Sequence, residues 1–287
     1  MKNIYTIILH IGDTAVTKKC LKSFLQHEKK YKQIIVVNND ARLLSAKDFG
    51  QKNILVLNNK KNLGFAKGVN VGIRYALGLH ADAILLLNND IQVKKTFISI
   101  LLQTLEDYKN IGIVGPAIAF LKNKKTVYDI GGSIDMLTGK TSHQEVEKVE
   151  NKNILFPQYI TGAVMFIRKE VFEKIGFFDE DFFLYYEDAD FCLRARMAGF
   201  LIGVNPSLSL HHLLSKTIGK LTPFAVFYQT QSALIFGKKY MHSPIQKLLH
   251  MSFIVFQTTL ITCKHPLAGI TGWKAIFGIT KNVTIQL

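Results

Sequence analysis

Short apolar runs alternate with amphipathic segments along the N-terminal part of the chain. Runs rich in isoleucine, leucine and valine cover residues 4–9, 34–37, 54–57 and 83–87, and segments of helical periodicity cover residues 17–27 and 68–79. Strands that alternate with helices are typical of a parallel α/β sheet. The pattern therefore predicts an α/β fold, whose ligands are expected outside the carboxyl ends of the strands.

The hydrophobic pattern is less regular in the middle of the chain and changes again toward its end. A lysine-bearing stretch at residues 122–125 and a charged stretch at residues 145–152 predict loops. The apolar run at residues 248–262 is too short and too polar to span a bilayer, and it fits either an interfacial helix or a buried amphipathic one. A boundary near Leu214 predicts a larger domain of residues 1–214 and a helical tail of residues 215–287.

Charge separates these two parts more sharply than hydropathy does. Lysine and arginine number 36 against 21 aspartates and glutamates, a formal net charge of +15, and no acidic residue follows Asp190. A basic, apolar C-terminal region favours contact with an anionic membrane surface. We predict no nucleic-acid partner, because the sequence has no zinc-finger spacing, no RNP-type aromatic motif and no basic helix with heptads.

Cysteine usage and the N-terminal segment indicate a reducing, cytoplasmic compartment. Cys20, Cys192 and Cys263 are far apart and form no CxxC pair, which argues against a disulfide framework and a cysteine zinc site. The apolar stretch after Met1 is short and has no small-residue cleavage site, so it predicts a buried first strand and not a signal peptide.

Two polar clusters can together hold a divalent cation. Asn88, Asn89 and Asp90 follow a buried strand and place one carboxylate at the mouth of the expected cleft, although the same residues fit an Asx turn. His211 and His212 follow a second apolar run, where a structural role is the plainer interpretation. One carboxylate, one imidazole and a substrate diphosphate can complete the shell of magnesium or manganese.

An acidic cluster of Glu187, Asp188 and Asp190 precedes a helix-like segment at residues 191–198. Acidic residues at a helix start are favoured by the helix dipole and by capping alone. A crowded carboxylate cluster beside aromatic residues is also a place where one pKa rises enough for general-base catalysis. The residues alone leave both interpretations open.

A glycine-bearing turn at residues 62–70 opens a helix and offers backbone N–H groups to an anion. It has neither the GxGxxG spacing nor the P-loop spacing, so dinucleotide binding and P-loop hydrolysis lose support. By itself this turn indicates no ligand more specific than an anion.

In order along the chain, these segments resemble the inverting nucleotide-sugar glycosyltransferases of family 2, in the branch of rhamnosyltransferase-like enzymes. The most specific match is residues 182–194, where several spaced residue types coincide. The similarity also takes in residues 4–25, 35–39, 62–70, 87–90, 161–163 and 176–180. His211-His212 fits the histidine that closes the family's motif set, and the acid-free C-terminal region matches the basic, apolar helices in which members commonly end.

The resemblance implies a GT-A-like fold: an α/β architecture with a mixed, mostly parallel sheet flanked by helices, and a basic, apolar helical C-terminal region. It implies that Asp188 is the general base and that Asp90 and His211 are the protein ligands of Mn2+ or Mg2+. The residues expected at the nucleotide sugar are Asn38, Asn62, Gly64, Lys67, Asn70, Asn88, Asn89, Gly162, Ala163 and Glu187. Members usually have Asp where this chain has Asn38, so its base preference can differ.

The implied reaction moves a sugar from a dTDP- or UDP-sugar to a hydroxyl of a glycan or lipid-linked acceptor. The implied setting is bacterial surface polysaccharide assembly, by a protein peripheral on the cytoplasmic face of the cell membrane. A catalytically silent relative that binds a membrane or a partner through its basic tail is the alternative, motivated by Asn38. The joint presence of Asp90, Asp188 and His211 argues against it, because a silent protein has no chemical need for all three.

Overall fold

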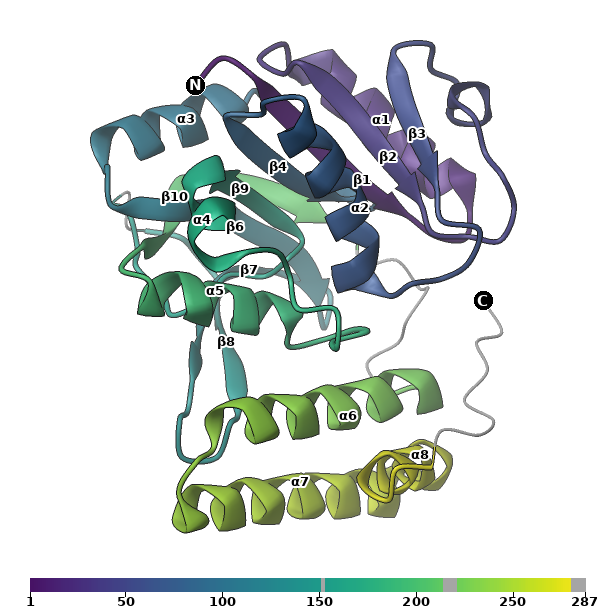
Figure 1. Cartoon of the computed structure of the whole chain (residues 1–287), viewed down its shortest axis with the longest axis vertical. Helices are drawn as coiled ribbons and strands as arrows, with labels where there is room; N and C mark the ends of the chain where they lie inside the picture. Colours follow the sequence, from purple (N-terminus) through teal and green to yellow (C-terminus); the bar gives the residue numbers. More distant parts are fainter. Residues whose placement is uncertain (151–152, 214–220, 280–287) are drawn as a thin grey trace.

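The computed structural model describes residues 1–150, 153–213 and 221–279, which form one large sheet with helices on both faces and a further helical layer below it (Figure 1). The strands are β1 (Ile4–His10), β2 (Gln33–Asn38), β3 (Ile54–Asn58), β4 (Ala83–Asn88), β5 (Ile91–Gln92), β6 (Ile111–Lys122), β7 (Lys125–Ile134), β8 (Thr141–Val146), β9 (Val164–Arg168) and β10 (Leu201–His212). The helices are α1 (Thr14–His27), α2 (Phe65–Gly78), α3 (Ile98–Asp107), α4 (Lys169–Ile175), α5 (Glu187–Met197), α6 (Pro223–Tyr240), α7 (Pro244–Lys264) and α8 (Pro266–Ile276), with a 3-10 turn at Ala46–Phe49.

The first four strands are parallel and lie in the order β3-β2-β1-β4. Side chains along β1 alternate between the two faces, so Ile7 packs in one apolar cluster and Ile8 in the other. Helices α1 and α3 cover the face of Ile8, and α2, α4 and α5 cover the face of Ile7. The predicted α/β alternation is confirmed here, and β1, β2 and β4 all end at the same edge of the sheet.

Beyond β4 the sheet is mixed. Strand β9 is antiparallel to both β4 and β6, whereas β10 runs parallel to β6. The last two residues of β10, His211 and His212, pair with the short strand β5 directly after Asp90. This pairing brings the end of β10 to the end of β4, although the two segments are far apart in the sequence.

The middle of the chain forms strands over part of the region where the sequence predicted loops: residues 145 and 146 end β8, whereas residues 147–150 belong to no helix or strand, as predicted. Strands β6 and β7 pair as an antiparallel hairpin, and β8 adds to β7. Asn123 and Lys124 make the two-residue turn, with φ angles of 51° and 66°. Such turns need left-handed residues, and Asn-Gly or Asp-Gly is the strong sequence signal for them. The loop prediction for residues 122–125 is therefore wrong outside the turn itself, because an Asn-Lys turn carries a weaker signal.

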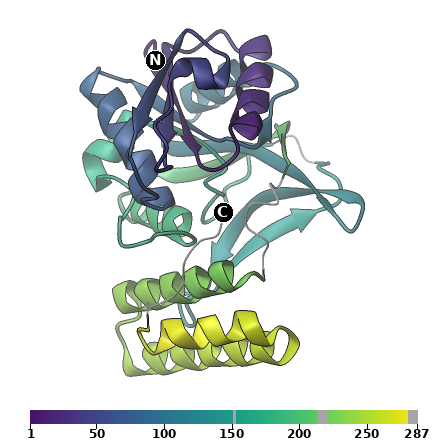
Figure 2. The same cartoon turned by 90° about the vertical axis from the view of Figure 1, so that its right-hand side faces the viewer.

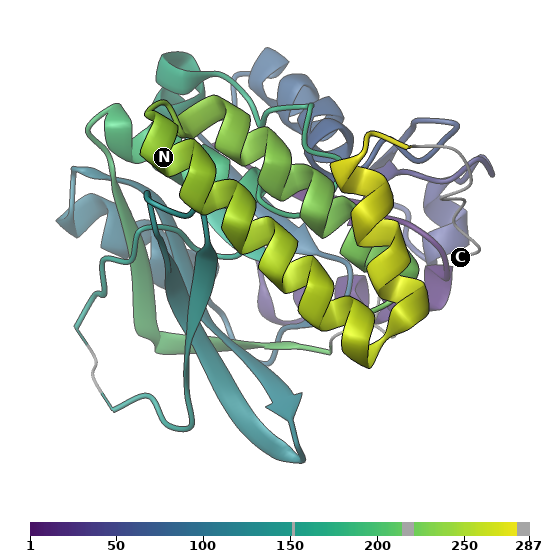
Figure 3. The same ribbon diagram turned by 90° about the horizontal axis from the view of Figure 1, so that it is seen from below.

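Helices α6, α7 and α8 form a separate layer, seen from the side in Figure 2 and from below in Figure 3. The layer is attached to α5 through charge: Lys239 Nζ of α6 lies 2.6 Å from both Asp179 Oδ2 and the fully buried Asp190 Oδ1. Tyr240 donates a hydrogen bond to Asp190 at 2.7 Å. The predicted boundary at Leu214 lies within residues 214–220, outside the described part of the chain, and so do residues 280–287 of the predicted tail.

The tip of the β7–β8 hairpin reaches down to α7 (Figure 1). His250 of α7 is buried and its Nδ1 lies 2.6 Å from Thr138 O at that tip. A Cβ atom at Gly237 of α6 would lie 2.0 Å from His250 Nε2, so only glycine allows the two helices to approach this closely. The hairpin, α6 and α7 are therefore packed together around one imidazole ring.

The outer surface of α7 and α8 is largely apolar. Its exposed members, which we call the apolar face, are Ile245, Leu248, Leu249, Met251, Val255, Phe256, Leu260, Leu267 and Ile270. Near the end of α7, Cys263 is exposed, whereas Cys20 and Cys192 are buried. Among the helices of the described residues, none combines the length and the hydropathy needed to cross a membrane.

Candidate active site

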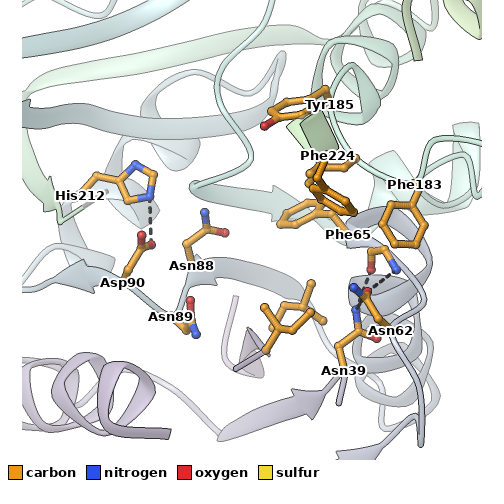
Figure 4. A pocket seen from close by; sticks show the side chains of 14 residues that line it. Asn39, Asn62, Phe65, Asn88, Asn89, Asp90, Phe183, Tyr185, His212 and Phe224 are labelled. Atoms are coloured by element: carbon orange, nitrogen blue, oxygen red, sulfur yellow. Dashed lines mark hydrogen bonds and ion pairs between the residues drawn. The ribbon is translucent and has the colours of Figure 1, made fainter. Parts of the chain in front are cut away.

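A pocket of about 290 Å³ opens at the carboxyl ends of β1, β2 and β4, and we call it the strand-end pocket (Figure 4). Its polar lining residues are Asn39, Asn62, Asn88, Asn89, Asp90 and His212, and its aromatic lining residues are Phe65, Phe183, Tyr185 and Phe224. The pocket lies where chain order reverses between β1 and β4, which is the expected ligand position in an open α/β sheet.

Asp90 and His212 form the charged end of this pocket. Asp90 Oδ1 lies 2.9 Å from His212 Nε2, and the two side chains are 7% and 18% exposed. Because side chains alternate along a strand, the neighbouring His211 lies on the opposite side of β10, where burial and nearby Lys94 lower its pKa. The pocket thus combines one carboxylate with one imidazole.

An amide network forms the opposite end of the strand-end pocket. Asn39 Nδ2 donates to Asn62 Oδ1 and to the carbonyl oxygen of Gly64, each at 3.0 Å. Asn62 Oδ1 also accepts from the backbone N–H of Gly64 at 2.9 Å. Both acceptor positions of Asn62 Oδ1 are used inside the protein, which leaves its NH2 group as a donor for a ligand.

Gly64 positions the aromatic side of the pocket. Its φ of 79° is left-handed, and a Cβ atom there would lie 2.3 Å from the carbonyl oxygen of Phe183. That oxygen accepts a hydrogen bond from the backbone N–H of Phe65 at 2.7 Å. The ring of Phe183 in turn stacks on Tyr228 with centroids 4.4 Å apart. The glycine turn predicted from the sequence therefore sets the distance between α2 and the aromatic segment.

A second pocket of about 380 Å³ adjoins the first, and we call it the acid pocket. Its lining includes Glu187 and Asp188 at the start of α5, Gly162 and Ala163 before β9, and His143 and Tyr159 on its far wall. Asp188 Oδ2 accepts from the backbone N–H of Gly162 at 3.0 Å, and Asp188 Oδ1 accepts from that of Ala189 at 2.8 Å. These two bonds fix the carboxylate in the pocket wall.

A strained turn precedes the two acids. Tyr185 and Tyr186 have φ angles of 68° and 66°, and neighbouring non-glycine residues in the left-handed region are uncommon. Strain of this kind collects at sites where the surrounding structure imposes it for function. Here it turns the chain so that Tyr185 lines both pockets while the next residues begin α5 at the acid pocket.

Burial raises the pKa of both acids in this pocket. For Glu187 the neighbouring Asp188 raises the pKa further, and Glu187 Oε2 is buried without a hydrogen-bond partner among the described residues. For Asp188, nearby His143 and the N–H bonds from Gly162 and Ala189 oppose the effect of burial, and the net direction is still upward. A carboxyl group with a raised pKa in a cleft is suited to accept a proton from a ligand.

The two pockets meet along a common wall of four residues: Phe65, Asn88, Leu184 and Tyr185. A ligand bond placed at this wall would have Asp90 and His212 on one side and Asp188 on the other. The arrangement can neutralise a negative group that leaves toward one pocket while a base deprotonates a group that enters from the other.

The family model for glycosyl transferase family 2 matches residues 10–176, which is more than half of the chain. The chain belongs to glycosyl transferase family 2. The matched region contains the strand ends and the glycine turn of the strand-end pocket, whereas the acid cluster and His212 lie beyond it. The resemblance inferred from the sequence is therefore confirmed.

Curated relatives of this family 2 chain include rhamnosyltransferases. It is 25% identical to the dTDP-rhamnosyl transferase RfbF of Shigella flexneri, across 96% of this chain and 97% of the relative. It is 26% identical to the N-acetylglucosaminyl-diphospho-decaprenol L-rhamnosyltransferase of Mycobacterium tuberculosis, across 58% of this chain and 61% of that protein.

Solved structures confirm the GT-A fold. GalNAc-T7, solved with UDP, GalNAc and Mn2+, gives a TM-score of 0.63 at 11% identity, covering 83% of this chain and 49% of the other. The TarS fragment of S. aureus, solved with UDP, gives 0.52 at 12% identity, covering 85% of this chain and 68% of the other. At this identity the likeness shows the fold alone.

The sequence predicted a set of site residues for this family 2 transferase, and most of them line one of the two pockets. The strand-end pocket contains Asn62, Gly64, Asn88, Asn89 and Asp90, and the acid pocket contains Asn88, Gly162, Ala163, Glu187 and Asp188. Four expected residues line neither pocket: Asn38, Lys67, Asn70 and His211.

The structure gives Asn38 and Asn70 internal partners. Asn38 is buried and its Nδ2 donates to Arg42 O and Asn58 Oδ1, both at 2.7 Å, so it ties the end of β2 to the end of β3. Asn70 Nδ2 donates to Phe178 O at 2.8 Å, which fastens α2 to the segment before α5.

Lys67 also connects α2 to the segment before α5. Its Nζ lies 3.4 Å from Glu180 Oε2, and Arg74 of the same helix lies 2.7 Å from Glu180 Oε1. These exposed cations support the segment that carries the aromatic wall, without lining either pocket.

Several residues of the site were missed by sequence reasoning. Asn39 and His212 are the direct neighbours of two expected site residues, Asn38 and His211. Phe65, Phe183 and Tyr185 lie within segments that resemble the family, whereas Phe224 lies in no such segment. The sequence around His143 and Tyr159 does not mark them as site residues. They line the acid pocket only because of the β7–β8 hairpin, which the sequence did not predict.

Proposed function

We propose that this protein is an inverting glycosyltransferase that moves a hexosyl or rhamnosyl group from a dTDP- or UDP-sugar to a hydroxyl of a glycan or lipid-linked acceptor. The observation that carries the proposal is the wall shared by the strand-end and acid pockets. Inversion needs the leaving diphosphate and the attacking hydroxyl on opposite faces of the anomeric carbon, and the two pockets supply those two sides.

The residues of the strand-end pocket fit a divalent cation. Ligand atoms about 2.1 Å from an octahedral ion lie about 3 Å from each other, and Asp90 Oδ1 and His212 Nε2 are 2.9 Å apart. Within the described residues no group of three or more histidine, cysteine, aspartate or glutamate side chains could hold a metal alone. Donor diphosphate and water would therefore complete the shell of Mn2+ or Mg2+, whose charge offsets that of the leaving diphosphate.

The donor side of the proposal rests on the amide network and on the relatives. The NH2 group of Asn62 has no acceptor among the described residues and can donate to a carbonyl oxygen of a pyrimidine base. One relative is a dTDP-rhamnosyl transferase, and two structures of the same fold contain UDP. Asp188 would take the proton of the acceptor hydroxyl as it attacks, because its carboxylate lines the adjoining pocket.

The acceptor side rests on the helical layer. The apolar face of α7 and α8 is exposed, and Lys247, Lys264 and Lys274 lie on the same two helices without any acidic residue. Such a surface favours an anionic bilayer, and one relative acts on a diphospho-decaprenol lipid. We place the protein on the cytoplasmic face of the membrane, in the assembly of bacterial surface polysaccharide.

The experiment that tests this function measures nucleotide binding by isothermal titration with two neighbouring variants. The wild type is expected to bind dTDP or UDP in a manganese-dependent way. His212→Ala is expected to weaken that binding about tenfold or more, because it removes one of two protein ligands. His211→Ala is the matched control and is expected to bind like the wild type.

Equal loss in both histidine variants would contradict the assignment of His212. If the folded wild type binds none of the nucleotides in a manganese-dependent way, that result would contradict the proposed function and favour a catalytically silent, membrane-binding relative.

A further inference from the structure

The β7–β8 hairpin supplies the far wall of the acid pocket, and His143 is the one basic residue among the lining residues that the structure describes. His143 Nδ1 lies 2.8 Å from Asp129 Oδ2, and the Asp129 side chain is only 10% exposed. The other oxygen of Asp129 accepts from the backbone N–H of Gly131 at 2.9 Å. The carboxylate of Asp129 is thus fixed by its own strand, and it fixes the imidazole.

The segment at residues 159–162 contacts the hairpin at one end and Asp188 at the other. The ring of Tyr159 meets that of His143 edge-on, with centroids 5.2 Å apart and an interplanar angle of 69°. The carbonyl oxygen of Tyr159 accepts from the backbone N–H of Gly132 at 2.8 Å, so this segment follows the hairpin. Further along the same segment, Gly162 donates its backbone N–H to Asp188 Oδ2.

Asp188 takes part in no ion pair among the described residues, although basic side chains lie near α5. Arg194 is paired with Asp190, and Lys239 is paired with Asp190 and Asp179. His143 is therefore the basic group that faces Asp188 across the acid pocket.

We propose that His143, anchored by Asp129, is a positioning residue of the transfer reaction that keeps the Asp188 carboxylate charged and ready to accept a proton. The proposal rests on the proposed role of Asp188 as general base. A buried carboxyl group with an acidic neighbour is less ionised near neutral pH, and an imidazolium across the pocket offsets that loss.

The titratable groups around Asp188 come from several elements: Asp129 on β7, His143 on β8, Tyr159 before β9, Tyr185 and Tyr186 before α5, and Glu187 and Cys192 on α5. Burial raises the pKa of the three tyrosines and of Cys192, so all four are neutral near pH 7. Asp129 and Glu187 are acidic. His143 is therefore the member of this set whose charge favours the ionised form of Asp188.

The test is a pH titration followed by NMR of protein labelled with 13C at the aspartate carboxyls, which needs neither donor nor acceptor. The Asp188 resonance is assigned by its loss in Asp188→Asn. His143→Gln keeps a hydrogen-bond donor toward Asp129 and removes the positive charge, so the titration midpoint of Asp188 is expected to rise by about one pH unit. His143→Arg restores the charge and is expected to return the midpoint toward its wild-type position.

A titration midpoint of Asp188 that stays unchanged in His143→Gln overturns the proposal. A midpoint that shifts equally in His143→Gln and His143→Arg also overturns it, because an effect of structure alone would not depend on the charge of the new side chain. The reciprocal measurement does not depend on the hairpin variants. Asp188→Asn is expected to lower the midpoint of His143 in 13C-histidine-labelled protein, since the coupling is mutual, and an unchanged midpoint also overturns the proposal. Full transfer activity of Asp188→Asn would instead contradict the proposed function.

Discussion

Asp188 has a pKa that burial raises, and it lines the acid pocket opposite the proposed cation site. A general base must be ionised before it can take a proton, so activity is expected to fall as the pH falls through that raised pKa. The side chain has no contact with the strand-end pocket, which separates its expected effect on turnover from any effect on nucleotide binding.

We predict that Asp188→Asn lowers kcat by about 100- to 10,000-fold, the range typical of a lost general base. Manganese-dependent binding of dTDP or UDP is expected to stay within about twofold, because Asp188 lines the acid pocket and is not among the residues that line the strand-end pocket. Release of the nucleotide diphosphate from the donor, with bacterial membranes as the source of acceptor, measures the first quantity, and isothermal titration measures the second. A kcat near the wild-type value would remove Asp188 from the mechanism.

The close approach of Gly64 to Phe183 gives a prediction about stability. Gly64→Ala is expected to destabilise the protein by about 2 kcal/mol or more, because a left-handed alanine and a methyl group against Phe183 O are both unfavourable. Gly78→Ala at the end of the same helix is the control, since nothing lies within 4 Å of its added Cβ. Its stability is expected to stay within about 1 kcal/mol of the wild type. Urea unfolding of the two variants compares them directly, and equal losses would contradict this account.

Neighbouring residues show how far the candidate site could be predicted from the sequence. The choice of Asp90 and Asp188 comes from the family resemblance, whose motifs specify both residue type and position, and both residues line the pockets. Between Asn38 and Asn39, or His211 and His212, the sequence offers two similar side chains, and a shift of one residue along a strand reverses the face. Only the register of β10 against β5 shows that His212 meets Asp90.

Among whole elements, the parallel half of the sheet and the helical character of the C-terminal region could be predicted, whereas the hairpin and the docking of α6 could not. Apolar runs and helical periodicity are local signals, so they locate β1 to β4 and the helices between them. The β6–β8 hairpin depends on an Asn-Lys turn with weak local preference. The docking of α6 depends on Lys239, Asp179 and Asp190, which are brought together from distant parts of the chain.

This docking gives a prediction with a defined pH dependence. Burial alone would raise the pKa of Asp179, but its bonds with Lys239 and with the backbone N–H of Asp181 outweigh burial and lower the pKa. Stability from such a carboxylate is present above its unfolded pKa of about 3.9 and is lost as the pH falls through the folded value. Lys239→Met is therefore expected to reduce the free energy of unfolding by about 2 kcal/mol at pH 7.

The difference between Lys239→Met and the wild type is expected to shrink as the pH falls below about 4. The exposed neighbour Lys238 provides the control, because Lys238→Met removes the same charge from the same helix without breaking an ion pair among the described residues, and it should change stability by less than about 0.5 kcal/mol. Urea unfolding at several pH values measures all three proteins. A difference that persists unchanged at low pH would show that Lys239 acts through packing and not through charge.

In the whole molecule, the apolar face lies on the outer side of the helical layer, and the acid pocket lies behind it. Gln229 of α6 lines the acid pocket and also the crevice between α6 and α7. Helices α7 and α6 therefore both lie between the expected membrane surface and the acid pocket. A lipid-linked acceptor would need to leave the bilayer by about two helix diameters, on the order of 20 Å.

The double variant Leu248→Ser/Phe256→Ser is expected to weaken binding to vesicles of phosphatidylglycerol and phosphatidylcholine by about tenfold or more, because it removes two apolar side chains from the bilayer. Leu43→Ser/Leu121→Ser is the matched control: its side chains are 62% and 71% exposed, against 68% and 62% for Leu248 and Phe256. Vesicle flotation at low and high salt measures binding, and salt is expected to weaken it. Equal flotation of both double variants would contradict a membrane role for the apolar face.

The distribution of the three thiols provides a built-in reporter for that surface. Burial raises the pKa of Cys20 to about 12 and also raises that of Cys192, and since the thiolate is the reactive form, neither should react with a maleimide in the folded protein. Cys263 is exposed, and it lies on the same side of α7 as Phe256 and Leu260. A polarity-sensitive dye can thus be attached at one native position without any mutation, and the colour of its emission would show whether that end of the helix is in water or in lipid.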